Sequence, residues 1–290
     1  MESGVGRRKI FVPVLWLLFL LIPRVEAQDP HPLKARLIPE VFSIQPGGTF
    51  CLGILLTIED GWHTYWKNPG DAGIPTTIEW RLPEGWVAGP TKWPFPRKFD
   101  EADIITYGYQ KEAFLITDVK APDSAENARP AELAVHLEWL VCREGCLAGR
   151  ADLSLELPIK KENPEVNVLW SPRFREALEQ IPAPSADWDI KAYTKGEGYA
   201  LFFKPPLGLD RDLKEVTFFA EESEVIDHSA PQRLSRSDAG YVLELKRSPY
   251  SSGIAPRLTG VLLAEDGWDR SRKRSAILLD QRVEQEGLKK

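Results

Sequence analysis

The chain has 290 residues and a formal net charge of −6, with acidic and basic residues spread along its length. This distribution excludes the basic face that a nucleic-acid-binding protein needs. The 24 prolines and 10 tryptophans favour a β-protein with long loops over a helical protein. The length suits one large domain or two ordinary ones.

The first 27 residues have the features of a secretory signal peptide. A basic stretch at 7–9 precedes an apolar stretch at 10–22, and Val25-Glu26-Ala27 offers a small-residue cleavage site. The apolar stretch is too short to span a membrane comfortably, and no later segment approaches 18 consecutive apolar residues. We therefore expect cleavage after Ala27 and export to the periplasm, where a cysteine pair can be stably oxidised.

Most of the remaining segments alternate in the period of two that is typical of β-strands. Before residue 171, strands are predicted at 35–44, 49–60, 75–81, 113–119, 132–141 and 147–157. The segment 172–181 instead predicts a helix, with Ser171 as its cap, Pro172 in its first turn, and Pro182 and Pro184 ending it. Later strands are predicted at 187–194, 198–204, 214–220, 240–246, 257–265 and 274–280.

These elements predict an all-β protein of two β-sandwich domains joined by a short helical connector. The expected boundaries are 28–170 for the first sandwich, 171–185 for the connector and 186–280 for the second sandwich. The polar residues 281–290 are expected to form a frayed tail.

Cys142 and Cys146 lie within a predicted β-hairpin. Residues Arg143-Glu144-Gly145 form its loop, with Gly145 able to take the left-handed conformation that such a turn needs. The two cysteines then face each other across an antiparallel pair, with Cα atoms about 4.5–5.5 Å apart. This separation lies within the range of a disulfide.

Such a pair is either a passive staple or a redox-active centre. A disulfide that closes so short a loop stabilises the fold by only about 2 kcal/mol, and a domain of well over one hundred residues does not need it. The magnitude therefore favours the redox-active pair. Cys51 is the odd cysteine, and its apolar, strand-like surroundings predict a buried free thiol.

The segment from Gly61 to Pro75 is rich in aromatic residues, with Trp62, Tyr65 and Trp66 close together. These side chains either plug the end of the sandwich before a tight loop, or present a surface to a protein partner or a sugar. The sequence leaves these alternatives open.

The segments that carry chemistry resemble one known family. The sequences GWHTYWKNPGDAGIP (61–75), FDEADIITYGYQKEAFL (99–115) and EWLVCREGCLAG (138–149) resemble the periplasmic N-terminal region of DsbD-type protein-disulfide reductases, in particular the ScsB-like branch. The sequence FFAEESEVIDHSAPQ (218–232) extends the resemblance into the second sandwich. Members of this family have an immunoglobulin-like fold, which the resemblance implies here for both sandwiches.

The resemblance implies a thiol–disulfide oxidoreductase component in which Cys142 and Cys146 are the redox pair. Its electron donor would be a membrane-embedded thiol reductase of the DsbD or CcdA type, and its acceptor an exported thioredoxin-fold protein. A cap over the cysteines is implied between Phe99 and Tyr109, with Phe99, Tyr107 or Tyr109 lying over the sulfurs. The family's membrane and thioredoxin-like domains have no counterpart in these 290 residues.

Two other classes of function compete with this hypothesis. A copper-tolerance or metal-handling protein would use Cys142, Cys146 and His136, which is a sparse set of ligands. A non-catalytic immunoglobulin-like binding module would use the aromatic segment, because this fold supports many functions. No organic cofactor and no resident metal are expected.

Overall fold

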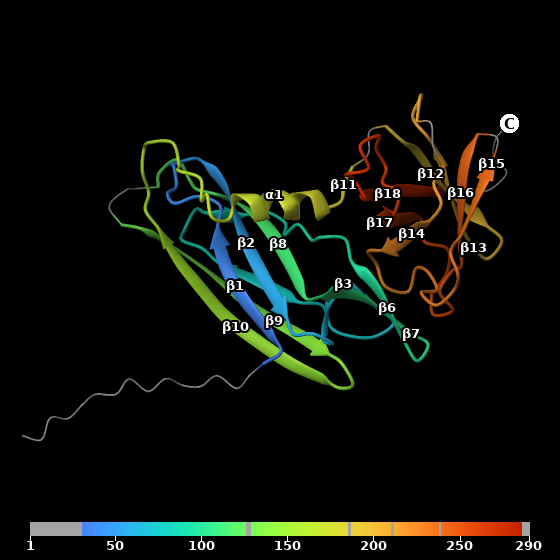
Figure 1. Ribbon diagram of the computed structural model, residues 1–290, viewed down its shortest axis with the longest axis horizontal. Coiled ribbons are helices and arrows are strands. Elements are labelled where there is room, and N and C mark those ends of the chain that lie inside the picture. Colours follow the sequence, from blue (N-terminus) through green and yellow to red (C-terminus); the bar gives the residue numbers. More distant parts are fainter. Residues whose placement is uncertain (1–30, 126–128, 185–186, 210–211, 238, 286–290) are drawn as a thin grey trace, which may run out of the picture. The chain divides into compact units, whose positions relative to one another are not determined.

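The computed structural model describes residues 31–285 apart from 126–128, 185–186, 210–211 and 238 (Figure 1). The predicted signal peptide lies outside the described residues. Strands dominate the described residues, and α1 (Ser171–Gln180) is the only helix among them. The all-β prediction is confirmed.

Two sheets form the first sandwich. The four-stranded sheet has the order β1-β2-β8-β5, and the six-stranded sheet has the order β10-β9-β3-β7-β6 with β4 also paired to β9. Their bounds are β1 Leu33–Pro39, β2 Thr49–Ile58, β3 His63–Gly70, β4 Thr77–Arg81, β5 Val87–Ala88, β6 Arg97–Glu101, β7 Ile104–Gln110, β8 Glu112–Lys120, β9 Ala131–Cys142 and β10 Cys146–Leu157.

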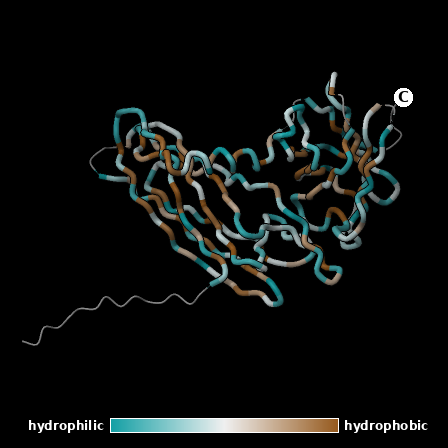
Figure 2. The backbone as a smooth tube through the Cα atoms, in the orientation of Figure 1, coloured by the Kyte–Doolittle hydropathy of each residue, from teal (hydrophilic) through white to brown (hydrophobic). Residues whose placement is uncertain are grey.

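The core of this sandwich lies between the two sheets. Leu56 and Leu115 of the four-stranded sheet pack with Trp66, Tyr107 and Leu137 of the six-stranded sheet. The apolar residues, drawn in brown, run along the strands in Figure 2. The alternation that predicts β9 from sequence appears directly in its burial, because every second residue from Ala131 to Val141 is buried.

A third set of strands follows the helix. Its order is β14-β17-β18-β12-β13-β16-β15, with β11 also paired to β18. Side chains from both halves of this ladder share one core, including Phe218 and Leu262 from one half and Phe203 and Leu243 from the other. The bounds are β11 Ala183–Pro184, β12 Asp189–Lys195, β13 Gly198–Lys204, β14 Val216–Ala220, β15 Arg233–Ser237, β16 Gly240–Leu245, β17 Arg257–Ala264 and β18 Ala276–Glu284.

Two details differ from the sequence predictions. Ser171 does not cap α1 but is its first residue, and the capping position belongs to Trp170, which makes no side-chain capping bond. Residues 281–284 are not a frayed tail, because β18 continues to Glu284 and its end pairs with β12. Residues 286–290 of the predicted tail lie outside the described part.

The helix does more than connect the two halves. Phe174 and Ala177 are buried against Leu55 and Phe114 of the four-stranded sheet. Packing on this sheet compensates for the missing N-terminal cap, since amphipathic burial supplies most of the stability of a short helix. Ile181 ends the helix directly before Pro182, as predicted.

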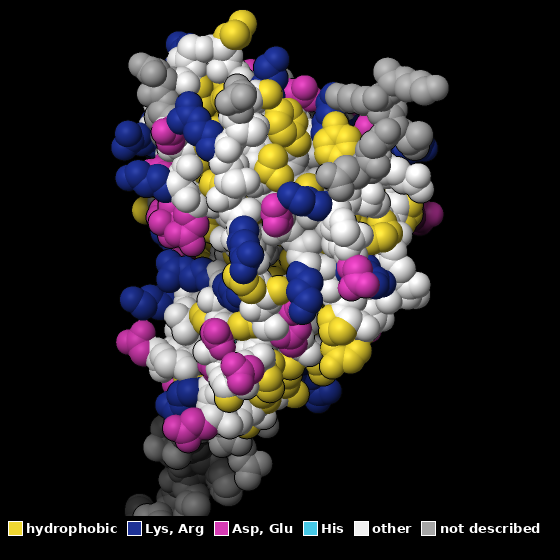
Figure 3. All heavy atoms as spheres, turned by 90° about the vertical axis from the view of Figure 1, so that its right-hand side faces the viewer, with side chains coloured by type: hydrophobic (Ala, Val, Ile, Leu, Met, Phe, Trp, Pro, Cys, Tyr) yellow, Lys and Arg dark blue, Asp and Glu magenta, His cyan; other side chains and the backbone are white. Residues whose placement is uncertain are grey.

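The two sets of strands share packed side chains. Phe219, Val261 and Ala276 from the third sheet belong to the same buried cluster as Trp66 and Tyr107. The division into two domains stays a prediction, because this shared core joins the two predicted domains. Figure 3 shows Lys and Arg side chains mixed with Asp and Glu on the face that it draws, so this face carries no continuous basic patch.

Candidate redox site

The cysteine hairpin has the register that the sequence predicts. Cys142 ends β9, Cys146 begins β10, and the two residues are directly paired. Their Cα atoms are 4.1 Å apart and their sulfurs form a disulfide. The loop differs from the prediction, because Gly145 does not adopt the left-handed conformation. The backbone N–H of Arg143 donates to the carbonyl of Gly145 at 3.0 Å.

The two sulfurs differ in accessibility. Cys142 is 3% exposed, whereas Cys146 lies in the exposed tip of the hairpin. Disulfide exchange requires an attacking sulfur to reach one sulfur of the bond, and access therefore selects the site of attack. Only Cys146 is open to a partner protein.

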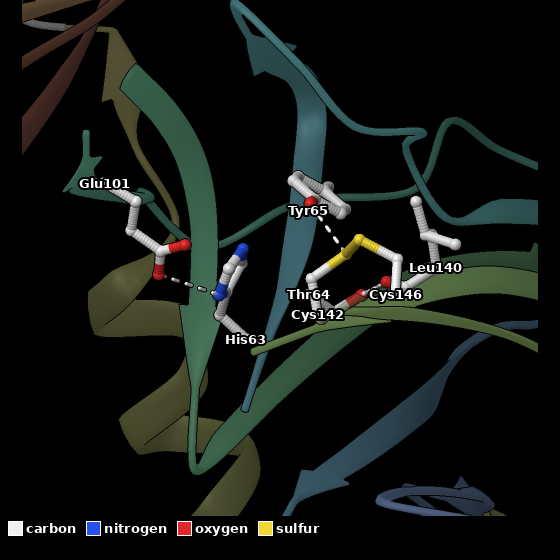
Figure 4. The surroundings of a disulfide bond; sticks show 7 residues. All are labelled: His63, Thr64, Tyr65, Glu101, Leu140, Cys142 and Cys146. Atoms are coloured by element: carbon white, nitrogen blue, oxygen red, sulfur yellow. Dashed lines mark hydrogen bonds and ion pairs between the residues drawn. A yellow bond between two sulfur atoms is a disulfide. The ribbon is translucent and has the colours of Figure 1, made fainter. Parts of the chain in front are cut away.

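Tyr65 of β3 contacts the buried sulfur. Its hydroxyl donates to Sγ of Cys142 at 2.9 Å (Figure 4). Burial, with a smaller contribution from the charge of Glu101, raises the pKa of Tyr65, so the hydroxyl stays protonated at neutral pH. Gly73 makes this geometry possible, since a Cβ at Gly73 would lie only 2.2 Å from the Tyr65 ring. The loop that follows β3 can therefore lie directly on that ring.

His63 also faces the disulfide, and no sequence motif points to it. It is paired with Cys142 across β3 and β9, and its side chain is buried. The ring stacks on Phe99 with centroids 5.0 Å apart, and its Nδ1 lies 3.8 Å from Oε1 of Glu101. Burial lowers the pKa of His63, and the charge of Glu101 partly opposes that shift.

The three proposed cap residues have different positions. Phe99 pairs with Thr106 and reaches the site through His63. Tyr107 and Tyr109 are not over the sulfurs. Tyr109 pairs with Thr64, and Thr64 pairs with Val141, so all three side chains lie on one face of the sheet. Tyr109 and Val141 are buried in the core, and Cys142, the next residue, points to the opposite face. Period-two geometry places Tyr107 on that core face as well.

The aromatic segment separates into three environments. Trp66 is buried in the core and Tyr65 is buried against Cys142, so neither is available as a docking surface. Trp62 is partly exposed, and the guanidinium of Arg143 lies 5.1 Å from its ring centroid. Of the three predicted docking aromatics, only Trp62 remains accessible, and it lies beside the cysteine loop.

The family comparison matches the part of the chain that contains this site. Residues 32–158 match the model described as "Thiol:disulfide interchange protein DsbD, N-terminal". Residues 32–158 form a DsbD N-terminal domain. None of the curated proteins matches the chain.

Solved structures extend the likeness beyond this DsbD N-terminal domain. The N-terminal periplasmic domain of ScsB from Proteus mirabilis superposes with a TM-score of 0.64 at 16% identity, covering 89% of this chain and 95% of that chain. This match shows a shared fold that includes strands after α1. The reduced DsbD N-terminal domain of Neisseria meningitidis is 16% identical over 42% of this chain and 84% of its own, with a TM-score of 0.26.

His136 is separate from the disulfide of Cys142 and Cys146. It lies six residues before Cys142 on an extended strand, about 20 Å away along the chain. Its Nδ1 lies 2.9 Å from Oδ1 of Asp152, and this hydrogen bond is the main cause that raises the pKa of His136. Within the described residues, no group of three or more His, Cys, Asp or Glu side chains is placed to hold a metal ion.

Cys51 lies apart from the site and is half-buried rather than fully buried. Its thiol donates to Oδ1 of Asp118 at 3.3 Å. Burial and the nearby charge of Glu40 raise the pKa of this thiol well above its ordinary value. Because the thiolate is the reactive form, Cys51 is expected to be chemically quiet at neutral pH.

We expect iodoacetamide to label Cys146 at least about 10-fold faster than Cys51 in the reduced, folded protein at pH 8. Mass spectrometry of quenched samples measures both rates. Labelling in denaturant is the control, where all three cysteines are expected to react alike. Equal rates in the folded protein, or a disulfide that includes Cys51, would contradict this assignment.

Proposed function

We propose that this protein is an exported thiol–disulfide exchange module that works through Cys142 and Cys146. It would take electrons from a membrane-embedded thiol reductase of the DsbD or CcdA type and pass them to exported thioredoxin-fold proteins. The observation that supports this proposal most strongly is the unequal exposure of the two sulfurs at the tip of a hairpin.

The asymmetry assigns a role to each cysteine. In the reduced module, the Cys146 thiolate attacks the disulfide of the acceptor, forms a mixed disulfide and releases one acceptor thiolate. Cys142 then attacks Sγ of Cys146, which re-forms the Cys142–Cys146 bond and releases the second acceptor thiolate. Two electrons pass to the acceptor. Reduction by the donor runs through the same steps in reverse.

The surface beside Cys146 supports contact with a protein partner. A hollow of about 470 Å³ lies along the same hairpin, between the loop after β3 and the start of β10, and is lined by Ile74, Leu140, Ala148 and other residues. Ile74 is 60% exposed at its rim. An exposed apolar side chain at the rim of a hollow on the cysteine hairpin fits a transient protein contact.

Two observations support export. The sequence predicts a signal peptide, whose residues lie outside the described part of the chain, and the structural relative from Proteus mirabilis is a periplasmic domain. Among the residues that the structure describes, no helix has the length and apolar character needed to cross a membrane.

Trapping the mixed disulfide tests the proposed function. The Cys142→Ser variant keeps the exposed thiol but lacks the resolving thiol, so an adduct with exported thioredoxin-fold proteins is expected to accumulate. The Cys146→Ser variant keeps only the buried thiol and is expected to give at least about 10-fold less adduct, since access limits the rate. Non-reducing gels and mass spectrometry identify the adducts.

Both variants should be made in a Cys51→Ser background, which removes the third thiol without touching the site. If neither variant forms a reducible adduct, the proposed exchange function is wrong. If Cys146→Ser forms the dominant adduct, the assignment of roles to the two cysteines is wrong.

A further inference from the structure

His63 lies directly opposite the buried cysteine. Directly opposite residues on antiparallel strands project from the same face with Cβ atoms about 4.5–5.5 Å apart, and His63 and Cys142 are such a pair. Figure 4 shows the His63 ring between Glu101 and the two sulfurs. The imidazole is the basic side chain that the close-up draws beside the disulfide.

One nitrogen of this ring has no partner in the oxidised protein. His63 is 3% exposed, and its Nε2 is buried without a hydrogen bond. Buried polar atoms are paired in the great majority of cases, so such an atom calls for an explanation. A disulfide sulfur has no proton to donate. Reduction of the bond gives Cys142 a thiol proton, and with it a donor on the same face of the sheet.

The surroundings fix the orientation of the ring. Phe99 stacks on one face at an interplanar angle of 22°, and Tyr65 meets the ring edge-on with centroids 5.3 Å apart. The carboxylate of Glu101 lies on the Nδ1 side. A carboxylate there favours the tautomer with its proton on Nδ1, and the lone pair then lies on Nε2.

We propose that His63 is the general base of the resolving step, and that its Nε2 takes the proton of the Cys142 thiol. This proposal rests on the proposed exchange function. The Cys142 sulfur attacks Sγ of Cys146 in the mixed disulfide, and the S–S bond to the partner breaks. The partner leaves as a thiolate, Cys142 and Cys146 are oxidised to the disulfide, and the proton resides on His63 until it passes to the released thiolate or to solvent.

The charged and titratable groups around the ring are consistent with this role. Tyr65 from β3 stays protonated and donates to the Cys142 sulfur, so it stabilises the thiolate but does not accept its proton. Glu101 from β6 lies on the other side of the ring, and the β7 residue paired with His63 is the uncharged Gln110. Burial keeps His63 neutral at neutral pH, which a base requires.

Glutathione disulfide is a suitable probe, because it tests the resolving step without a protein partner. The reduced full-length protein is mixed with it, samples are quenched in acid, and mass spectrometry follows the protein–glutathione mixed disulfide. In His63→Gln, formation of this intermediate at Cys146 is expected to keep its rate. Its resolution is expected to slow about 100-fold at pH 7, a typical loss for a missing general base.

The pH profile separates a base from a structural residue. Without His63, resolution depends on spontaneous ionisation of the Cys142 thiol, so the variant rate should rise about 10-fold per pH unit and approach the wild-type rate at high pH. The matched control is His136→Gln, which changes a histidine on the neighbouring strand away from the sulfurs. Its resolution rate is expected to match that of the wild type.

A second variant keeps the test decisive if His63→Gln does not fold. Glu101 is largely exposed, and its charge raises the pKa of His63. Glu101→Gln should therefore shift the lower midpoint of the resolution profile to lower pH. An unchanged midpoint in Glu101→Gln would overturn the proposal. So would a resolution rate in His63→Gln that equals the wild-type rate, or that is slowed by the same factor at every pH. Failure of both Cys142→Ser and Cys146→Ser to form any adduct would instead overturn the exchange function itself.

Discussion

Replacing Trp139 with alanine is expected to lower the free energy of unfolding by about 3–5 kcal/mol, whereas reducing the Cys142–Cys146 disulfide is expected to lower it by no more than about 2 kcal/mol. Trp139 is 6% exposed and packs in the main core of the first sandwich with Leu137 and Val141. The disulfide closes only the tip of a hairpin whose strands are paired along their whole length. The core, and not the bond, should therefore hold this domain together.

Denaturant melts of the oxidised wild type, the reduced wild type and Trp139→Ala measure these differences. Leu147→Ala is the control, because Leu147 lies in the same hairpin but is 46% exposed. Its unfolding free energy is expected to stay within about 0.5 kcal/mol of the wild type. An unfolded reduced protein would show that the disulfide is a structural staple, which the proposed exchange cycle cannot accommodate.

The sequence predicts the cysteine hairpin well because the interactions that form it are between residues close together in the sequence. Alternating residues on both flanks and a three-residue loop determine the register, and the structure pairs Cys142 with Cys146 as expected. The left-handed Gly145 is not found, because a loop of this length has more than one solution. Strands β9 and β10 each lie within one residue of the predicted bounds.

The residues that surround the disulfide could not be found in the same way. Strand β3 contains Asn68, Pro69 and Gly70, which indicate a turn, and its first half is buried on both faces, so it shows no alternation. Without β3 as a strand, the opposition of His63 to Cys142 has no signal in the sequence. The polar strand β6, which carries Phe99 and Glu101, also shows no apolar alternation, because its side chains are exposed or half-buried.

The error over Tyr107 and Tyr109 shows how much depends on a strand assignment. Treated as a loop, residues 99–109 could place any of their aromatic side chains over the sulfurs. As two paired strands they cannot, because alternate residues point to opposite faces. Phe99 then lies on the face of His63, and the two tyrosines lie in the core.

The packing between the first sandwich and the strands after α1 is a long-range property that no local pattern reveals. Asn68 illustrates it, because its side-chain amide donates to the carbonyls of Ala220 at 2.9 Å and Glu222 at 3.2 Å. The hydroxyl of Tyr107 forms a 2.8 Å hydrogen bond with Nδ1 of His228. Both contacts join β3 and β7, which lie beside the candidate redox site, to residues more than 100 positions away.

Phe219→Ala is expected to lower the free energy of unfolding by about 3–5 kcal/mol and to loosen β7 in particular. Phe219 is buried among first-sandwich residues and meets Tyr107 edge-on with ring centroids 4.9 Å apart. Its neighbour Phe218 points instead into the core of the third sheet, so Phe218→Ala is a matched control of equal size. The two truncations should lower the free energy of unfolding by similar amounts, but only Phe219→Ala should loosen β7.

Hydrogen exchange of the β7 amides distinguishes these two variants. Phe219→Ala should raise their exchange relative to Phe218→Ala at equal overall stability, because it leaves a cavity beside Tyr107. Strand β7 pairs with β3, which carries His63 and Tyr65, so the loosening should extend toward the buried sulfur. Equal β7 exchange in the two variants would show that the strands after α1 do not support the candidate redox site.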